Sequence, residues 1–138
     1  MKKLTKSYLD ELTYEIIGAA IEVHKEMGPG LLESVYEECM LHELQLKGLN
    51  TKCQQAVPIN YKGTTLNTLL KYDILVDDCI IIELKAVTDM TLIFDAQIIS
   101  YAKLLKVPKS ILINFNCTNI FKEGQKTFVN EYFQNLPD

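Results

Sequence analysis

The chain has 138 residues, the size of one compact domain, and 48% of them are apolar, which is enough for a substantial core. Its 14 basic residues are all lysine and stand against 18 Asp and Glu, giving a formal net charge of −4. This balance excludes a strongly basic coat that binds nucleic acid indiscriminately, and the absence of arginine excludes any mechanism built on a bidentate guanidinium clamp.

The N-terminal region and the cysteines predict a cytoplasmic protein that does not insert into a membrane. Asp10 and Glu11 interrupt the N-terminal region before an apolar signal segment can form, and no apolar run approaches the ~20 residues that span a bilayer. The four cysteines are widely spaced and form no CxxC pair, so we expect free thiols in a reducing compartment. Without a repeat or a linker, residues 1–138 are expected to form a single domain.

Two amphipathic helices are predicted in the first third of the chain. Ser7-x-x-Asp10 resembles a capping box, and apolar residues then recur at intervals of three or four positions. Gly28-Pro29-Gly30 must break this helix, because proline cannot continue the hydrogen-bond ladder and disfavours helical geometry in the residue before it. A second helix is predicted from Leu32 to Lys47, with Gly48 as its C-terminal stop.

From Thr51 the sequence changes to short β-rich runs separated by turn residues. Strands are predicted at Cys53–Tyr61, Leu66–Val76 and Cys79–Val87, with a turn at Lys62-Gly63. Short connections between successive strands predict an antiparallel meander.

The remainder of the chain predicts a helix followed by further strands. Thr91–Lys106 is apolar on most sides, so we expect a buried helix that ends before Pro108. Ser110–Phe115 is continuously apolar, as expected for an interior strand, and Lys126–Val129 adds one more. The order ααβββαβ predicts an α/β or α+β fold in which helices flank a central mixed sheet.

Three charged residues lie inside these apolar strands. Asp73, Glu83 and Lys85 occupy runs that are otherwise apolar, where an unpaired charge is costly. Side chains alternate along a strand, so Glu83 and Lys85 are expected on the same face. Some compensating interaction is therefore required in this region.

The turn between the two strands decides whether Asp73 joins Glu83. A two-residue turn would leave Asp73 facing away from Glu83. A three-residue turn, Asp77 to Cys79, pairs Val76 with Ile80 and brings Asp73 directly opposite Glu83. We predict this second register, or an equivalent bulge, because it gathers two carboxylates and an ammonium at one point.

Two carboxylates held together repel each other, and a hard divalent cation is a common way to satisfy them. Asp73 and Glu83 are therefore candidate ligands of Mg²⁺ or Mn²⁺, whereas Zn²⁺ fits less well because the cluster has no thiolate or imidazole. Lys85 beside such a cation would orient or deprotonate a water, or stabilise charge on a phosphate. From the spacing alone, a buried ion-pair network without metal stays open as the alternative.

Several motifs of this chain resemble one known group of enzymes. Asp73, nine intervening residues and then Glu83-Leu84-Lys85 resemble the bipartite motif of the PD-(D/E)XK nuclease superfamily. The segment Gly30 to Tyr36 is similar to the motif that names the small GxxExxY proteins, a branch of that superfamily. Similar segments at 17–24, 96–101 and 112–115 extend the resemblance over nearly the whole chain.

This resemblance implies a restriction-endonuclease-like core and a nuclease dependent on Mg²⁺ or Mn²⁺. It implies that Asp73 and Glu83 bind the metal, with Lys85 as the catalytic lysine. Glu33 would be an auxiliary acid from the second helix, and Gln97 a polar group from the helix after the core strands. A favourable contact with the helix dipole is the alternative role for Glu33, and Gln97 is expected to be a buried amide with partners.

Relatives often differ from this chain at three positions near the motifs. They often carry a histidine where this chain has Phe94, a basic residue where it has Tyr72, and an arginine where it has Lys126.

The expected partner is nucleic acid, and no membrane contact is expected. Residues 101–126 contain five lysines and one acid, so they could form a basic surface around the site, although solvated lysines are the alternative. The leading hypothesis is a Mg²⁺-dependent nuclease acting on DNA or RNA. A catalytically inactive nuclease-fold module that binds nucleic acid or a protein partner, and a structural domain with buried ion pairs, stay open. A homodimer is a further possibility, because so small a fold often needs help to grip a duplex.

Overall fold

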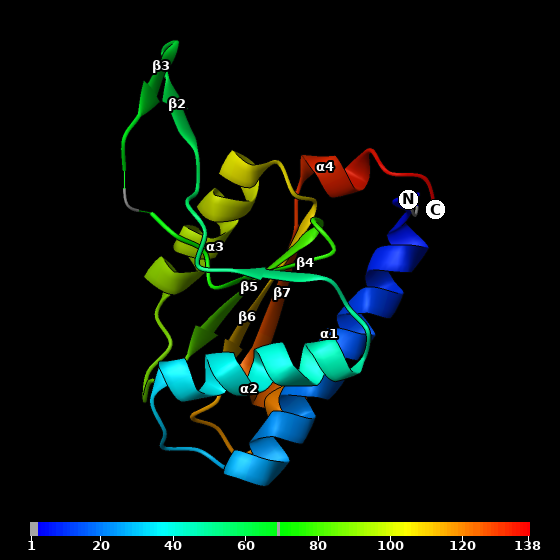
Figure 1. Ribbon diagram of the computed structural model, residues 1–138, viewed down its shortest axis with the longest axis vertical. Helices are drawn as coiled ribbons and strands as arrows, with labels where there is room; N and C mark the ends of the chain where they lie inside the picture. The colour runs from blue at the N-terminus through cyan, green and yellow to red at the C-terminus, as the bar shows by residue number, and fades with distance from the viewer. Residues whose placement is uncertain (1–2, 69) are drawn as a thin grey trace.

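The computed structural model describes residues 3–68 and 70–138, with a five-stranded mixed sheet between helices and a separate two-stranded hairpin (Figure 1). The helical elements are α1 (Lys6–Met27), α2 (Glu33–Leu46), α3 (Leu92–Leu105), a π-helical turn η1 (Ile120–Gly124) and α4 (Glu131–Gln134). The strands are β1 (Thr51–Cys53), β2 (Ile59–Tyr61), β3 (Thr64–Leu66), β4 (Ile74–Val76), β5 (Ile80–Lys85), β6 (Lys109–Asn114) and β7 (Gln125–Val129). The predicted fold class is confirmed.

The five strands lie in the order β1-β4-β5-β6-β7. β5 and β6 are parallel, because α3 carries the chain back across the sheet between them, and the other neighbours are antiparallel. The predicted meander therefore exists as β1, β4 and β5, with the β2–β3 hairpin inserted between its first two strands.

Each face of the sheet carries an apolar cluster. On one face α1 and α2 cover a cluster that includes the fully buried Ile74, Ile82 and Ile111. On the other face Ile81 and Leu112 pack with residues of α3. Neighbours along β5 thus belong to different clusters, as alternation along a strand requires. The strands that carry the charged residues are consequently held from both sides.

The start of α1 differs from the predicted capping box. Thr5 is the cap, with extended backbone and a hydroxyl oxygen that accepts the Tyr8 N–H at 3.0 Å, so Ser7 lies inside the first turn. The end of the helix is as predicted, because Gly28 takes a φ of +70° directly before Pro29.

Two predicted strands are each divided in the structure. Cys53–Tyr61 is interrupted because Gln54 adopts a left-handed φ of +50°, which ends β1 and leaves β2 in the hairpin. Leu66–Val76 is likewise divided between β3 and β4. The predicted turn at Lys62-Gly63 is confirmed, with φ values of +50° and +84° that suit a tight hairpin.

The prediction that α3 is buried on most sides is wrong. Only Ile98, Tyr101 and Ala102 of this helix are buried, whereas Leu92 is 79% exposed and Ile93 68% exposed. The apolar sequence of α3 suggested more burial than the structure has, because only one side of the helix packs against the sheet.

Two smaller findings concern the thiols and the helices. All four cysteines are free, as the sequence predicts. Within residues 3–68 and 70–138, no helix has the length and apolar character needed to cross a bilayer.

The turn between β4 and β5 has the predicted three residues. Val76 pairs with Ile80, and the Cys79 N–H donates to the Val76 carbonyl at 3.0 Å. The Asp77 carboxylate supports the turn, since it accepts the Asn50 N–H at 3.1 Å and the Tyr8 hydroxyl. One side chain therefore ties the turn to α1 and to the segment before β1.

We expect Asp77→Ala to lower the free energy of unfolding by about 1–3 kcal/mol, because the Asn50 N–H and the Tyr8 hydroxyl both lose their acceptor. Urea denaturation measures this change. Asp89→Ala, at an exposed position, is the control and should change the stability by less than about 0.5 kcal/mol. Equal unfolding midpoints for the two variants would contradict the role assigned to Asp77.

Candidate active site

The predicted register brings Asp73 and Glu83 together at the open end of the β4–β5 hairpin. Ile74 pairs with Ile82, so Asp73 lies opposite Glu83. The Asp73 N–H donates to Glu83 Oε1 at 3.1 Å, and the Leu84 N–H donates to Asp73 Oδ2 at 2.8 Å. Each carboxylate thus binds the main chain of the opposite strand, which fixes both acids in place.

Burial gives these two acids unequal properties. Glu83 is 8% exposed, and its burial, together with the negative charge of Asp73, raises the pKa of Glu83 to about 9. The positive charge of Lys85 acts in the opposite direction but does not prevail. At neutral pH and without added positive charge, Glu83 therefore retains its proton beside Asp73.

Lys85 shares a strand face with Glu83 but forms no ion pair with the acids. None of the ion pairs within residues 3–68 and 70–138 joins Lys85 to Asp73 or Glu83. Its ammonium instead lies 4.4 Å from the centre of the Phe94 ring, at the start of α3, in a cation–π contact. The alternative prediction is an ion-pair network of Asp73, Glu83 and Lys85. The structure instead places Lys85 on Phe94, so the lysine does not complete such a network.

Glu33 and Asp73 line the same cavity. This cavity has a volume of about 200 Å³, and it is bounded by Glu33, Ser34, Glu37, Gln54, Asp73 and Leu84. Glu33 is exposed in the first turn of α2, which brings it over the end of the strand pair. Glu33 can therefore both interact favourably with the dipole of α2 and line the cavity.

Gln54 and Glu37 are members of this cavity that the sequence did not reveal. The Gln54 side-chain amide donates to Glu37 Oε1 at 2.7 Å and to Asp73 Oδ1 at 3.0 Å. Glu37 follows Glu33 by one helical turn, so helical spacing could have found it. Gln54 gave no such signal, because its left-handed backbone interrupts what the sequence predicts as a continuous strand.

Gln97 differs from its predicted environment. It is exposed on α3, and its amide donates to the Tyr101 hydroxyl at 3.3 Å, so it is not the buried amide that the sequence predicts. It does not line the cavity of Glu33 and Asp73. Its role in the site stays a prediction.

Tyr36 explains how the loop before Glu33 is held. The fully buried Tyr36 ring stacks on Phe115 with 4.3 Å between centroids, and its hydroxyl donates to the Gly28 carbonyl at 2.5 Å. The same hydroxyl accepts the Leu31 N–H at 3.1 Å. The hydroxyl of Tyr36 therefore attaches the loop that precedes Glu33 to the core.

Comparison with known proteins identifies the family of the chain. A family profile described as the PD-(D/E)XK nuclease superfamily matches residues 10–128, from within α1 to within β7. The chain belongs to the PD-(D/E)XK nuclease superfamily. No curated protein and no solved structure matched in the corresponding searches. Superfamily membership suggests a nuclease, and nucleases of this superfamily generally use divalent metals.

The donor atoms of the candidate site suit a hard cation held by few protein ligands. Within residues 3–68 and 70–138, no group of three or more His, Cys, Asp or Glu side chains converges on one point. Mg²⁺ commonly binds through one or two carboxylates and keeps several waters. The Asp73 and Glu83 carboxylates therefore fit Mg²⁺ or Mn²⁺, since a cation's positive charge would favour the ionised form of the buried Glu83.

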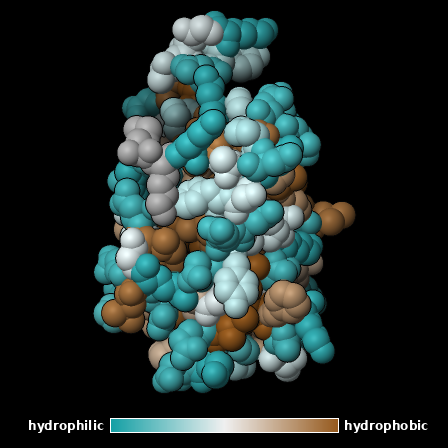
Figure 2. Space-filling model, turned by 90° about the vertical axis from the view of Figure 1, so that its right-hand side faces the viewer, coloured by the Kyte–Doolittle hydropathy of each residue, from teal (hydrophilic) through white to brown (hydrophobic). Residues whose placement is uncertain are grey.

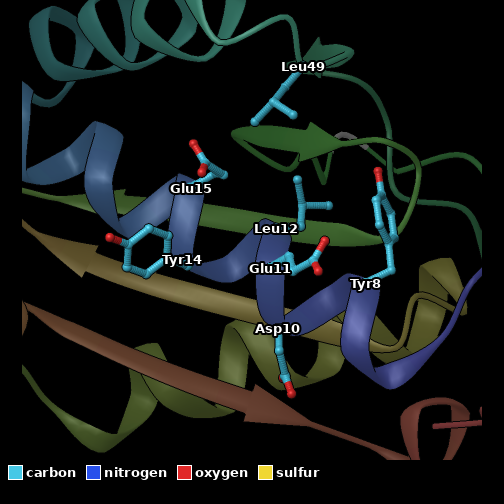
Figure 3. A pocket seen from close by; sticks show the side chains of 7 residues that line it. All are labelled: Tyr8, Asp10, Glu11, Leu12, Tyr14, Glu15 and Leu49. Atoms are coloured by element: carbon cyan, nitrogen blue, oxygen red, sulfur yellow. The ribbon is translucent and has the colours of Figure 1, made fainter.

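A larger cavity lies elsewhere on the protein. It has a volume of about 540 Å³ and lies along α1, where it is lined by Tyr8, Asp10, Glu11, Leu12, Tyr14, Glu15 and Leu49 (Figure 3). Its lining contains three carboxylates and no lysine, which is also true of the cavity at Asp73, so charge does not separate the two cavities. The smaller cavity is the candidate site because Asp73 and Glu33 line it.

The predicted basic surface of residues 101–126 is smaller than the sequence indicates. Lys109 is buried and binds Asp10 at 3.2 Å. Lys126 binds Asp95 at 3.1 Å. Two of the five lysines are thus used within the fold, because distant segments supply acids that the local sequence does not show.

The raised pKa of Glu83 makes the stability of the metal-free protein depend on pH. Between its ordinary value of 4.5 and about 9, the folded state keeps a proton that the unfolded state releases, so the free energy of unfolding falls as pH rises. Glu83→Gln resembles the protonated acid and removes this dependence. Thermal unfolding with EDTA should show the variant gaining stability relative to wild type as the pH increases through this range. Asp89→Asn is the control, and parallel curves for wild type and Glu83→Gln would contradict the assignment.

We expect Tyr36→Phe to lower the free energy of unfolding by about 1–3 kcal/mol, because it leaves the Gly28 carbonyl and the Leu31 N–H without their partner while the ring stack remains. Denaturant titration measures this loss. Tyr14→Phe removes an exposed hydroxyl and serves as the matched control. If both variants unfolded at the wild-type midpoint, the phenol would not be what holds the loop.

Proposed function

We propose that residues 1–138 form a nuclease-like domain that hydrolyses phosphodiester bonds of nucleic acid, with Mg²⁺ or Mn²⁺ bound by Asp73 and Glu83. The pairing of these two carboxylates beside Lys85, at the edge of a cavity that also contains Glu33, is the observation that carries the proposal. The segment Gly30 to Tyr36 further supports a place in the GxxExxY branch. Free cysteines are compatible with a reducing cytoplasm.

The residues of the chain divide the proposed chemistry between them. A divalent cation, when bound, would polarise the phosphate and lower the pKa of an attacking water. Lys85 would stabilise the charge that develops on the phosphate, and its contact with Phe94 directs the ammonium without neutralising it. Glu33, across the cavity from Asp73, would position a water or accept a proton. Gln97 would contact the substrate from the exposed side of α3.

One observation favours a second candidate, a nucleic-acid-binding or protein-binding module without catalysis. The Gln54 amide donates to Asp73 Oδ1 at 3.0 Å, while the Leu84 N–H occupies Oδ2. Each carboxylate oxygen has two lone pairs, so these two donors leave only part of the Asp73 carboxylate free to bind a cation. This candidate predicts nucleic-acid binding that does not depend on a divalent cation.

We expect the wild-type protein to cleave at least one of single-stranded DNA, duplex DNA, single-stranded RNA and duplex RNA when Mg²⁺ or Mn²⁺ is present. Lys85→Ala should reduce the rate about 100- to 1000-fold, because it removes a charge aimed at the developing anion. Gel electrophoresis of labelled oligonucleotides measures this rate, and Lys25→Ala, on the exposed side of α1, is the matched control. A folded wild-type protein that cleaves none of the four substrates would overturn the proposed activity.

We also expect Asp73→Asn to abolish Mn²⁺ binding while the fold is retained, because the amide can still accept the Leu84 N–H but carries no charge. Isothermal titration calorimetry with MnCl₂ measures binding independently of cleavage. Asp89→Asn should bind Mn²⁺ like the wild type. If Asp73→Asn bound Mn²⁺ as tightly as the wild type does, the metal site would lie elsewhere.

A further inference from the structure

The β2–β3 hairpin is a continuation of the paired segments β1 and β4, and Asp73 lies directly before β4. The pairing of β1 with β4 continues beyond Cys53 and Ile74, because the Gln54 N–H donates to the Asp73 carbonyl at 3.0 Å. The Tyr72 N–H then donates to Gln55 at 3.3 Å. Further along, Ala56 bridges Lys71, and the Val57 N–H donates to Leu70 at 2.8 Å. The hairpin is thus connected to the candidate active site by paired backbone.

The base of this hairpin is anchored and its tip projects. Val57 and Tyr72 are each only 2% exposed and belong to the apolar cluster that includes Ile98 of α3. Beyond them, β2 and β3 pair with each other and stand clear of the body at the top of Figures 1 and 2. An anchored base and an exposed tip are properties of an arm that contacts a ligand lying outside the domain.

The charge of this region is opposite to that of the whole protein. Residues 44–72 contain no Asp or Glu and four lysines, in a chain whose net charge is −4. Two of these, Lys47 and Lys52, bind Glu15 and Asp78. Lys62 and Lys71 are exposed and form no ion pair with any residue that the structure describes. The arm therefore presents uncompensated positive charge.

The tip also presents an aromatic ring. The register of the hairpin places Ile59, Tyr61, Thr64 and Leu66 on one face, whereas Asn60 and Thr65 bond to each other at 2.7 Å on the opposite face. Tyr61 is 59% exposed, and the Lys62 ammonium lies 5.4 Å from the centre of its ring. An exposed aromatic face beside a cation is the combination with which proteins hold unpaired nucleotides, by stacking on the base and attracting the phosphate.

We propose that the β2–β3 hairpin is a substrate arm that stacks an unpaired base on Tyr61 and places Lys62 on a neighbouring phosphate. The inference rests on the proposed function, because it takes the substrate to be nucleic acid. Unpaired bases fit better than a duplex groove, since Tyr61 shares its face with the exposed Leu66, and an aromatic ring stacks on bases that are free of a partner strand.

The position of the arm also sets the length of substrate that it contacts. Asp73 lies ten residues beyond Gly63 at the tip, so the arm reaches at most ~33 Å from the site at ~3.3 Å per strand residue. This distance corresponds to about ten nucleotides at the ~3.4 Å spacing of a stacked strand. A strand of about ten stacked nucleotides is therefore long enough to occupy the site and the arm together.

Fluorescence anisotropy with labelled single-stranded oligonucleotides tests the arm in EDTA, where no cleavage occurs. Tyr61→Ala should weaken binding of a 30-nucleotide strand about 5- to 150-fold, the range found when a stacked base loses its aromatic partner. Tyr14→Ala, which removes a tyrosine 77% exposed on α1, is the matched control and should leave the affinity unchanged. Lys62→Ala should reduce the slope of log affinity against log salt concentration by about 1, the value for one phosphate contact. Lys25→Ala should leave this slope unchanged.

Photocrosslinking provides a measurement that does not depend on a variant. A strand containing 5-bromouracil should crosslink to Tyr61, and mass spectrometry of the digested adduct identifies the residue. An unchanged affinity in Tyr61→Ala, an equal loss in Tyr14→Ala, or no binding by the wild type would overturn the arm, and the first two results would direct attention to another surface. Binding through Tyr61 without cleavage in Mg²⁺ or Mn²⁺ would instead overturn the proposed activity and leave the arm in place.

Discussion

The register of the β4–β5 hairpin is the constraint on which the candidate site depends. A shift of one residue would move every side chain of one strand to the opposite face and separate Asp73 from Glu83. The turn Asp77 to Cys79 prevents this shift, because the Asp77 carboxylate is bonded to α1 and to the segment before β1. The apolar residues of β4 and β5 resist the same shift, since they would exchange one packed cluster for the other.

This register has an electrostatic cost that the fold tolerates. Glu83 is buried beside Asp73, and its raised pKa means that the metal-free fold stabilises it as a neutral acid. Lys85 relieves little of this cost, because its ammonium rests on Phe94 and forms no ion pair with either acid. These two acids have hydrogen-bond donors but no cationic partner, and such a pair is better explained by function than by stability, since apolar residues there would cost less.

The other parts of the site are held by contacts between segments that are distant in sequence. The Tyr36 hydroxyl attaches the loop between α1 and α2 to the core, and this contact sets the position of Glu33 at the start of α2. Gln54 joins Glu37 of α2 to Asp73 of the strand pair. The same strand pair continues outward into the β2–β3 hairpin. Cavity, carboxylates and proposed arm are consequently parts of one connected framework.

Most of the helices and strands, the mixed sheet, the superfamily and the three-residue turn that sets Asp73 opposite Glu83 could be predicted from the sequence alone. These features depend on local periodicity and spacing, which a single chain displays directly. The folded chain was needed to reveal the left-handed backbone of Gln54, the exposed side of α3 and the pairing of Lys109 with Asp10. Each of these depends on a partner or a covering element far away in the chain, and local pattern carries no record of such contacts.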